Sequence, residues 1–232
     1  MIEYKMIYQE ESRYIMLKHV LFDVDGTLTD PLEGIINAIL YALPRMGIEP
    51  PADPKELKVL VGPPMLEALQ EYFHLSREDA QRMLTIYREY YTTKGLFEAT
   101  LHPGIPELLQ ALHDRGIQIH TATSKPIEFV EPLLRHFHLR DYFTFLGADD
   151  LACSRHSKDE VIAYVLQNIP DITPENTVMV GDRKYDVLSA SRFGLRTVGC
   201  AFGHAEPGEL EQAGAAYIAH TASETQHILL SL

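Results

Sequence analysis

Two aspartates follow a short apolar run near the start of the chain, in the stretch "HVLFDVDGTLTD" at residues 19–30. Asp23 and Asp25 stand two positions apart and are followed directly by Gly26 and Thr27. Two carboxylates this close repel each other unless a cation or a proton offsets their charge. One of them could attack an electrophile while the other transfers protons, and the pair could also bind a divalent metal ion.

Each acidic motif also has a simpler interpretation. An Asp-Gly pair after a strand often forms only a turn. A calcium loop of the EF-hand type requires glycine at its sixth position and glutamate at its twelfth. Here glycine is fourth and the twelfth residue is Gly34, so the spacing argues against that loop. A second motif, "GDRKYD" at residues 181–186, could be an aspartate that caps a helix.

Short apolar runs alternate with amphipathic segments from Gly104 onward. The apolar run before Asp23 is the first predicted strand. Further predicted strands lie within residues 115–124, 142–147, 176–182, 195–200 and 215–219. Predicted helices lie within residues 105–112, 126–139, 157–167, 183–194, 206–214 and 222–232. This alternation predicts right-handed βαβ crossovers and a parallel sheet between two layers of helices.

Residues 31–102 carry helical patterns without a strand pattern. Tandem prolines at residues 50–51 and 63–64 separate these helices, and Pro44 is expected to kink the first of them. We therefore predict an α/β core made of residues 16–30 and 103–232, with a helical insert at residues 31–102. Residues 1–15 form an N-terminal extension, either an extra edge strand or a loose segment.

Polar residues end four of the predicted strands. They are Asp23 with Asp25, Thr123 with Ser124, Asp149 with Asp150, and Asp182. Ligands of open parallel sheets bind beyond the carboxyl ends of the strands, near the point where the strand order reverses. The sequence therefore predicts that these side chains converge on one acidic pocket.

The composition limits the classes of partner. The 232 residues carry a formal net charge of −13 and no basic run, so a nucleic-acid partner is not expected. No apolar run reaches the roughly 18 to 20 residues that span a bilayer, so no membrane partner is expected. Two cysteines and the lack of a signal-like segment favour a cytoplasmic location. We expect a monomer, because no stretch resembles a dedicated interface.

Four motifs in order carry a family resemblance: "VLFDVDGTLTD", "IHTATSKP", "SKDEVI" and "VMVGDRKYDVLSA". They resemble the signature motifs of haloacid dehalogenase superfamily phosphatases, over roughly residues 17–220. The resemblance implies a Rossmann-like three-layer α/β/α core, with the helical insert as an α-helical cap domain. The segments "DPLEGIINAILYAL", "VGPPMLEAL", "ATSKP" and "REYY" resemble the phosphoglycolate phosphatase and bacterial 5′-nucleotidase-like branch.

The resemblance also implies residue roles. Asp23 is the expected nucleophile that forms an aspartyl-phosphate, and Asp25 is the expected general acid and then base. Mg²⁺ is the expected cofactor, because it prefers oxygen ligands. Its implied ligands are Asp23, the backbone carbonyl of Asp25, Asp182 and Asp186, the last directly or through water.

Three further positions are implied to bind the phosphoryl group. Thr123 and the backbone amide of Ser124 are expected at a helix N-terminus. Lys158 is expected to pair with Asp23 and with the phosphoryl group. Many relatives present this lysine before a proline, whereas here it stands in "SRHSKDE", so it is assigned from spacing. Lys125 is the competing candidate.

The implied function is a magnesium-dependent phosphomonoester hydrolase that acts on a small phosphorylated metabolite and is phosphoglycolate phosphatase-like. The alternative is a 5′-nucleotidase acting on nucleoside monophosphates. A phosphomutase shares all four motifs, and a non-catalytic binding protein on this fold is a further class. The insert, through the "VGPPM" loop at residues 61–65, is expected to select the substrate. Its tyrosines Tyr87, Tyr90 and Tyr91 are interpreted as packing residues rather than as a nucleobase platform.

Overall fold

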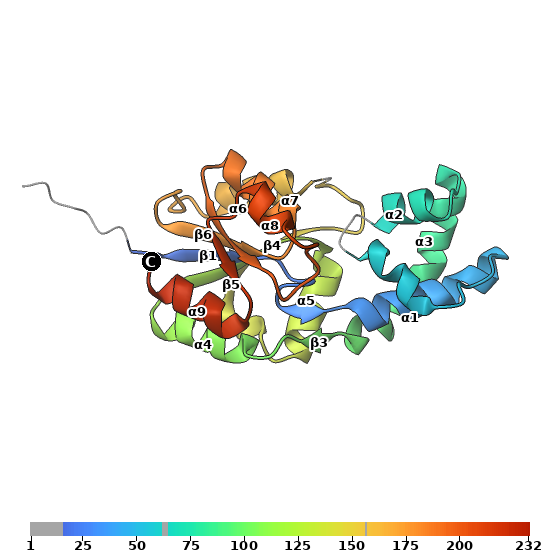
Figure 1. The fold of residues 1–232 in the computed structure, drawn as a ribbon, viewed down its shortest axis with the longest axis horizontal. Helices are drawn as coiled ribbons and strands as arrows, with labels where there is room; N and C mark the ends of the chain where they lie inside the picture. Colours follow the sequence, from blue (N-terminus) through green and yellow to red (C-terminus); the bar gives the residue numbers. More distant parts are fainter. Residues whose placement is uncertain (1–15, 62–64, 156) are drawn as a thin grey trace, which may run out of the picture.

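The computed structural model describes residues 16–61, 65–155 and 157–232. The extension at residues 1–15 and most of the "VGPPM" loop lie outside these ranges. Within them, a parallel sheet has the strand order β5-β4-β1-β6-β7-β8 (Figure 1). Its strands are β1 (His19–Phe22), β4 (Gln118–Pro126), β5 (Phe143–Asp149), β6 (Thr177–Gly181), β7 (Arg196–Cys200) and β8 (Tyr217–Ala219). The order reverses at β1, which confirms the doubly wound parallel sheet.

Helices cover both faces of this sheet (Figure 1). One layer holds α4 (Ile105–Asp114), α5 (Ile127–His136) and α9 (Ala222–Leu230), and the other holds α6 (Lys158–Asn168), α7 (Lys184–Arg192) and α8 (Glu209–Ala213). A 3-10 turn, η4 (Arg140–Tyr142), precedes β5. Successive side chains of β1 serve different layers, because a strand alternates its faces. Val20 and Phe22 join the larger core cluster, whereas Leu21 packs with Val161 and Ile162 of α6.

The helical insert begins after β2 (Thr29–Asp30) and ends before β3 (Thr100–Leu101), and these two short strands pair antiparallel. It contains α1 (Leu32–Ala42), η1 (Leu43–Met46), η2 (Pro54–Leu60), α2 (Met65–Tyr72), α3 (Arg77–Tyr91) and η3 (Gly95–Glu98). It lies at one end of the core in Figure 1. The insertion of a helical segment into an α/β core is therefore confirmed.

The first helix of the insert differs from its prediction. Pro44 does not kink α1, which already ends at Ala42. The proline stands in the 3-10 turn η1, which closes at Gly47 with a φ of 70°. Pro44 thus stands at the start of the 3-10 turn, a position where its missing amide hydrogen and fixed φ are tolerated.

Helix α3 shows how the insert builds its own core. Ser76 caps the helix by accepting a hydrogen bond from the amide of Asp79 at 3.1 Å. Met83, Tyr87 and Tyr91 recur at intervals of four residues and are buried.

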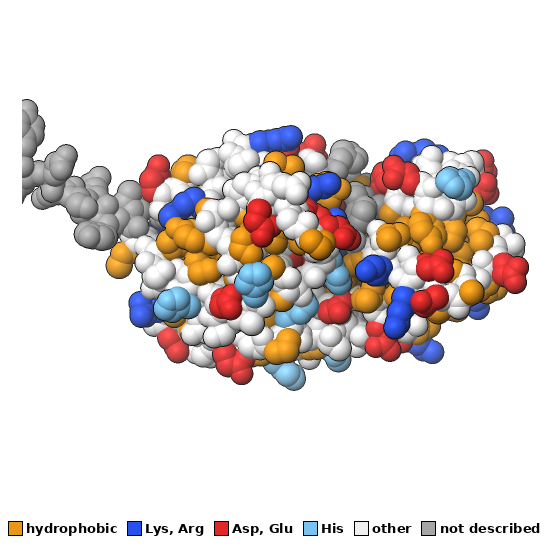
Figure 2. Space-filling model, viewed as in Figure 1, with side chains coloured by type: hydrophobic (Ala, Val, Ile, Leu, Met, Phe, Trp, Pro, Cys, Tyr) orange, Lys and Arg blue, Asp and Glu red, His pale blue; other side chains and the backbone are white. Residues whose placement is uncertain are grey.

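On the face of the molecule in Figure 2, acidic and basic side chains are interspersed over both the core and the insert. None of the helices in the described ranges is long and apolar enough to cross a membrane.

Two buried histidines lie inside the sheet. His19 Nδ1 lies 3.2 Å from His120 Nε2, and His19 Nε2 lies 3.3 Å from Asp171 Oδ2. His120 is completely buried. Burial, helped by the neighbouring His19, lowers the pKa of His120 from 6.5 to about 4. The folded chain therefore keeps His120 neutral under mildly acidic conditions.

This histidine predicts an acid-sensitive stability. The unfolded chain binds the proton below about pH 6.5, whereas the folded chain resists it until about pH 4. The free energy of unfolding should therefore fall as the pH drops through this window, by up to about 3 kcal/mol. Urea unfolding at pH 7, 5.5 and 4.5 measures the effect, and His120→Leu should flatten it. An equal loss of stability in both proteins would contradict the assignment.

Candidate active site

The first acidic motif leaves the sheet through a tight turn. The amide of Asp23 still donates to the Val180 carbonyl of β6 at 2.9 Å. Gly26 then adopts a φ of 85°, and a Cβ at this position would lie 2.1 Å from Asp182 Oδ2. Only glycine fits both the left-handed conformation and the close approach. The turn therefore brings the segment after β1 against the segment after β6.

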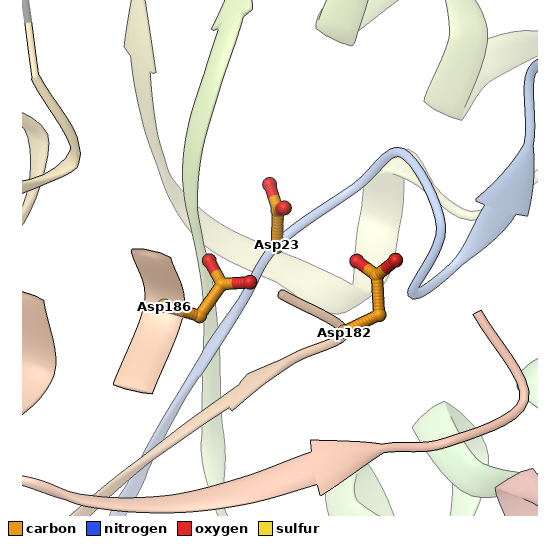
Figure 3. A group of neighbouring side chains, drawn as sticks. All are labelled: Asp23, Asp182 and Asp186. Atoms are coloured by element: carbon orange, nitrogen blue, oxygen red, sulfur yellow. The ribbon is translucent and has the colours of Figure 1, made fainter. Parts of the chain in front are cut away.

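Three carboxylates meet at this edge of the sheet (Figure 3). Asp23 follows β1, Asp182 follows β6, and Asp186 lies in the first turn of α7. One oxygen from each lies within 4.8 Å of the others. Thr27 Oγ1 donates to Asp182 Oδ1 at 3.1 Å, and the amide of His204 donates to Asp182 Oδ2 at 2.8 Å. Asp182 is therefore held in place by hydrogen bonds from two other segments of the chain.

The electrostatics of this cluster fit a divalent cation. Burial raises the pKa of Asp182 well above its usual range, and the carboxylates of Asp186 and Asp23 raise it further. Burial also raises the pKa of Asp186. Both shifts arise because negative charge is crowded into a site removed from water. Hard oxygen donors at this separation are the ligands that such cations prefer, so these residues fit the divalent metal ion that the resemblance implies.

Lys158 partly offsets this charge. Its Nζ lies 2.9 Å from Asp23 Oδ1 and 2.9 Å from Asp186 Oδ1. The same Nζ donates to the Ala122 carbonyl at 3.1 Å. Burial alone would lower the pKa of Lys158, but the two carboxylates outweigh burial and raise it. Lys158 therefore stays charged, and one lysine faces three carboxylates.

The first residue of α6 carries this lysine. The preceding Ser157 caps the helix, and its side chain accepts a hydrogen bond from the amide of Glu160 at 3.3 Å. The cap sets the start of the helix, so the "SKDE" spacing places Lys158 at the edge of the sheet.

Lys125, the competing candidate, contacts a different carboxylate. Its Nζ lies 2.9 Å from Asp25 Oδ1 and 2.8 Å from Asp25 Oδ2. It also donates to the hydroxyl of Tyr91 at 2.6 Å. Of the two aspartates in the first motif, Asp23 therefore pairs with Lys158 and Asp25 pairs with Lys125. The sequence contained no signal for the contact with Tyr91, which depends on how the insert packs on the core.

The expected phosphate-binding residues lie on β4. Thr123 is buried and its Oγ1 accepts from the amide of Lys125 at 3.2 Å, whereas Ser124 is exposed. The prediction that Ser124 lies at a helix N-terminus is wrong, because β4 continues to Pro126 and α5 begins only at Ile127. Residues before a proline avoid the helical conformation, which keeps Lys125 extended.

Asp149 and Asp150 do not join the carboxylate cluster within the part of the chain that the structure describes. Asp149 Oδ1 accepts from the amide of Arg155 at 2.9 Å, and Asp150 Oδ1 accepts from the amide of Ser154 at 3.1 Å. They stabilise the loop between β5 and α6. The predicted pocket is therefore less acidic than the sequence suggested.

The insert contacts this edge of the core. Arg183, next to Asp182, donates through Nη1 to the Val61 carbonyl at 3.4 Å. Tyr87 and Tyr91 are buried and stacked, with ring centroids 5.1 Å apart. Tyr90 is partly buried and donates to Glu98 Oε1 at 2.7 Å. The rings of Tyr87 and Tyr91 are therefore packing groups, as interpreted, although the Tyr91 hydroxyl also contacts Lys125 of the core.

Comparisons with known proteins identify the class. Residues 20–200 match the family model for haloacid dehalogenase-like hydrolases. The chain belongs to this hydrolase family, and the expectation of an enzyme with this fold is confirmed. A crystal structure of a "predicted phosphatase" from Clostridium acetobutylicum superposes with a TM-score of 0.88 at 36% identity, covering 94% of this chain and 100% of that one.

Three curated relatives indicate the branch. A 5′-nucleotidase of Pseudomonas aeruginosa is 38% identical over 83% of this chain and 86% of its own length. The tyrosine-protein kinase PtkA of Mycobacterium tuberculosis is 33% identical over 88% of this chain and 69% of its own length. Phosphoglycolate phosphatase 1 of P. aeruginosa is 27% identical over 80% and 70%. The chain is thus similar to both relatives that the motifs indicated.

Proposed function

We propose that this protein hydrolyses a small phosphorylated metabolite, a phosphomonoester, with Mg²⁺ as cofactor and through an aspartyl-phosphate on Asp23. One observation carries the proposal. Asp23 lies at the end of the central strand, beside the buried carboxylates of Asp182 and Asp186, with Lys158 Nζ 2.9 Å from its oxygen. A carboxylate can attack phosphorus at neutral pH when positive charge offsets the charge of the phosphoryl group.

Two aspartates share the proposed chemistry. An oxygen of Asp23 attacks phosphorus, the ester P–O bond breaks, and the leaving oxygen takes a proton from Asp25. In the second step Asp25 accepts a proton from water, the water oxygen attacks phosphorus, and the bond to Asp23 breaks to release phosphate. A bound Mg²⁺, held by Asp23, Asp182, Asp186 and the Asp25 carbonyl, would supply positive charge for the phosphoryl oxygens.

Three residues would hold the phosphoryl group. Lys158 would contact it while paired with Asp23. The hydroxyl of Thr123 and the amide of Ser124 would donate hydrogen bonds from the end of β4. Burial of Thr123 and Lys158 supports this arrangement, because donors shielded from water stabilise developing charge more strongly.

The substrate class rests on the relatives. The sequence motifs favour phosphoglycolate as the substrate. The identities to the relatives favour a nucleoside monophosphate, because the 5′-nucleotidase is 38% identical and the phosphoglycolate phosphatase 27% identical. A mutase, or transfer to a protein acceptor as the name of the kinase relative suggests, would use the same nucleophile with an acceptor other than water. A panel of phosphoglycolate, nucleoside monophosphates, sugar phosphates and phosphotyrosine separates these classes.

Removal of the metal is the first test. Phosphate release from p-nitrophenyl phosphate should stop when a chelator removes divalent ions and should return when Mg²⁺ is added back. The reason is that the single positive charge of Lys158, which contacts Asp23 and Asp186, cannot balance three clustered carboxylates. Unchanged turnover in the presence of the chelator would contradict the proposed role of the cluster, and no turnover in any metal would contradict the proposed reaction.

The proposal extends to the setting of this chemistry. We assign the core to residues 16–30 and 103–232, the cap to residues 31–102 and an extension to residues 1–15. Cap closure would exclude water and position the ester. The contact between Arg183 and Val61 supports a cap segment near the substrate. We further propose a cytoplasmic monomer.

A further inference from the structure

A second ion pair joins the first acidic motif to the cap. The ammonium group of Lys125 contacts both oxygens of Asp25, at 2.9 and 2.8 Å, and donates to the hydroxyl of Tyr91 at 2.6 Å. Asp25 follows β1, Lys125 stands near the end of β4, and Tyr91 is the last residue of α3. Three segments that are distant in the sequence therefore meet at one nitrogen.

Burial of the lysine restricts how the Asp25 carboxylate can be arranged. Lys125 is 8% exposed and Tyr91 is 4% exposed, whereas Asp25 is partly exposed. A lysine ammonium has three N–H donors. Its three acceptors here are the two carboxylate oxygens of Asp25 and the hydroxyl oxygen of Tyr91. A buried charge that loses its partner is costly, so the ammonium favours the arrangement in which it holds the Asp25 carboxylate.

Aromatic packing fixes the hydroxyl of Tyr91. Its ring stacks on Tyr87 of the same helix, with centroids 5.1 Å apart. It also makes a T-shaped contact with the ring of Phe129 of α5, with centroids 5.3 Å apart. Phe129 belongs to the core and Tyr87 to the cap. The position of the hydroxyl, and with it that of Lys125, therefore depends on α3 lying against the core.

We propose that Lys125 is a positioning residue that orients the Asp25 carboxyl group for proton transfer, and that Tyr91 makes this orientation depend on the cap. This inference rests on the proposed function. Proton transfer to the leaving oxygen requires the acid within hydrogen-bond distance and correctly oriented. A carboxyl group held at both oxygens by one buried ammonium has little freedom to rotate away.

The test uses the leaving group. p-Nitrophenolate departs readily without a proton, whereas an alkoxide requires one from the acid. Lys125→Met should therefore lower kcat/KM on the best alkyl phosphate of the substrate panel by about 10- to 100-fold. The loss on p-nitrophenyl phosphate should be clearly smaller. Tyr91→Phe, which keeps the stacked ring, should shift the ratio of the two kcat/KM values in the same direction by a smaller amount.

Two matched variants serve as controls. Lys94→Met removes an exposed lysine of the cap, and Tyr90→Phe removes the hydroxyl of the neighbouring tyrosine. Neither should change the ratio. Circular dichroism checks that Lys125→Met folds, and Tyr91→Phe supplies the independent readout if it does not.

The outcomes separate the two proposals. An equal loss of kcat/KM on both substrates in Lys125→Met, or no loss, would overturn the positioning role while wild-type turnover left the phosphatase proposal standing. An unchanged ratio in Tyr91→Phe would overturn the dependence on the cap. If the wild type released no phosphate from any ester, both the proposed function and this inference would be wrong.

Discussion

Replacing Asp23 by asparagine should abolish phosphate release, with kcat lowered by on the order of 10⁴-fold or more. Asparagine keeps the size of the side chain but lacks the anionic oxygen that attacks phosphorus. The carboxylate is also one of three oxygen donors to the proposed metal and a partner of Lys158. Steady-state phosphate release on the best substrate of the panel, at saturating Mg²⁺, measures the loss.

Asp141→Asn is the matched control for this substitution. Asp141 is exposed and lies in η4, on the segment that precedes β5. The control should keep wild-type activity, and thermal unfolding should show that both variants fold. If the Asp23→Asn variant folds and keeps a kcat within tenfold of the wild type, the nucleophile is misassigned. A tenfold change corresponds to about 1.4 kcal/mol in the activation barrier.

Replacing Lys158 by methionine should lower kcat/KM by on the order of 10²- to 10³-fold. The substitution removes the ammonium group that lies 2.9 Å from both Asp23 and Asp186. Phosphoryl charge would then develop beside carboxylates that have lost a countercharge. Initial rates on p-nitrophenyl phosphate and on the best alkyl ester measure this loss, which should affect both substrates.

Lys18→Met provides the comparison for Lys158. Lys18 is exposed and precedes β1, at the opposite end of the strand from Asp23. Its loss should leave kcat/KM unchanged. Loss of Lys158 also leaves buried carboxylates without a partner, which costs stability, so folding is checked by circular dichroism. A folded Lys158→Met variant with wild-type kcat/KM would transfer the proposed role to another cation.

The core could be predicted from the sequence because its signals are local. Short apolar runs alternate with amphipathic segments along the chain, and this alternation already predicts the class of fold. Two errors in the bounds of these elements occurred at proline. Pro44 ends α1 instead of bending it, and Pro126 extends β4 up to the start of α5. Both outcomes depend on which neighbouring backbone conformation the packing accepts.

The carboxylate cluster was predictable for a geometric reason. Asp23 and Asp182 follow parallel strands that turn out to be neighbours, and carboxyl ends of parallel strands share one edge. Asp149 follows the more distant β5 and instead accepts a hydrogen bond within its own loop. Strand order, which the sequence alone did not provide, decides between these outcomes.

The contact between Lys125 and Tyr91 had no sequence signal. Residues 91 and 125 belong to the cap and the core, and their meeting depends on how the aromatic rings of Tyr87 and Phe129 pack between these two parts. Such contacts follow from tertiary packing rather than from local pattern. Contacts of this kind can be recognised only in the folded structure.

The central claim is a covalent phosphoryl group on Asp23. Protein quenched in acid during turnover, or reduced with borohydride at the same moment, should be digested and examined by mass spectrometry. The account predicts that the peptide containing residue 23 carries one phosphoryl group, and that borohydride converts Asp23 to homoserine only when substrate is present. A phosphoryl group on any other residue, or none on Asp23 during an observed burst of product, would contradict it.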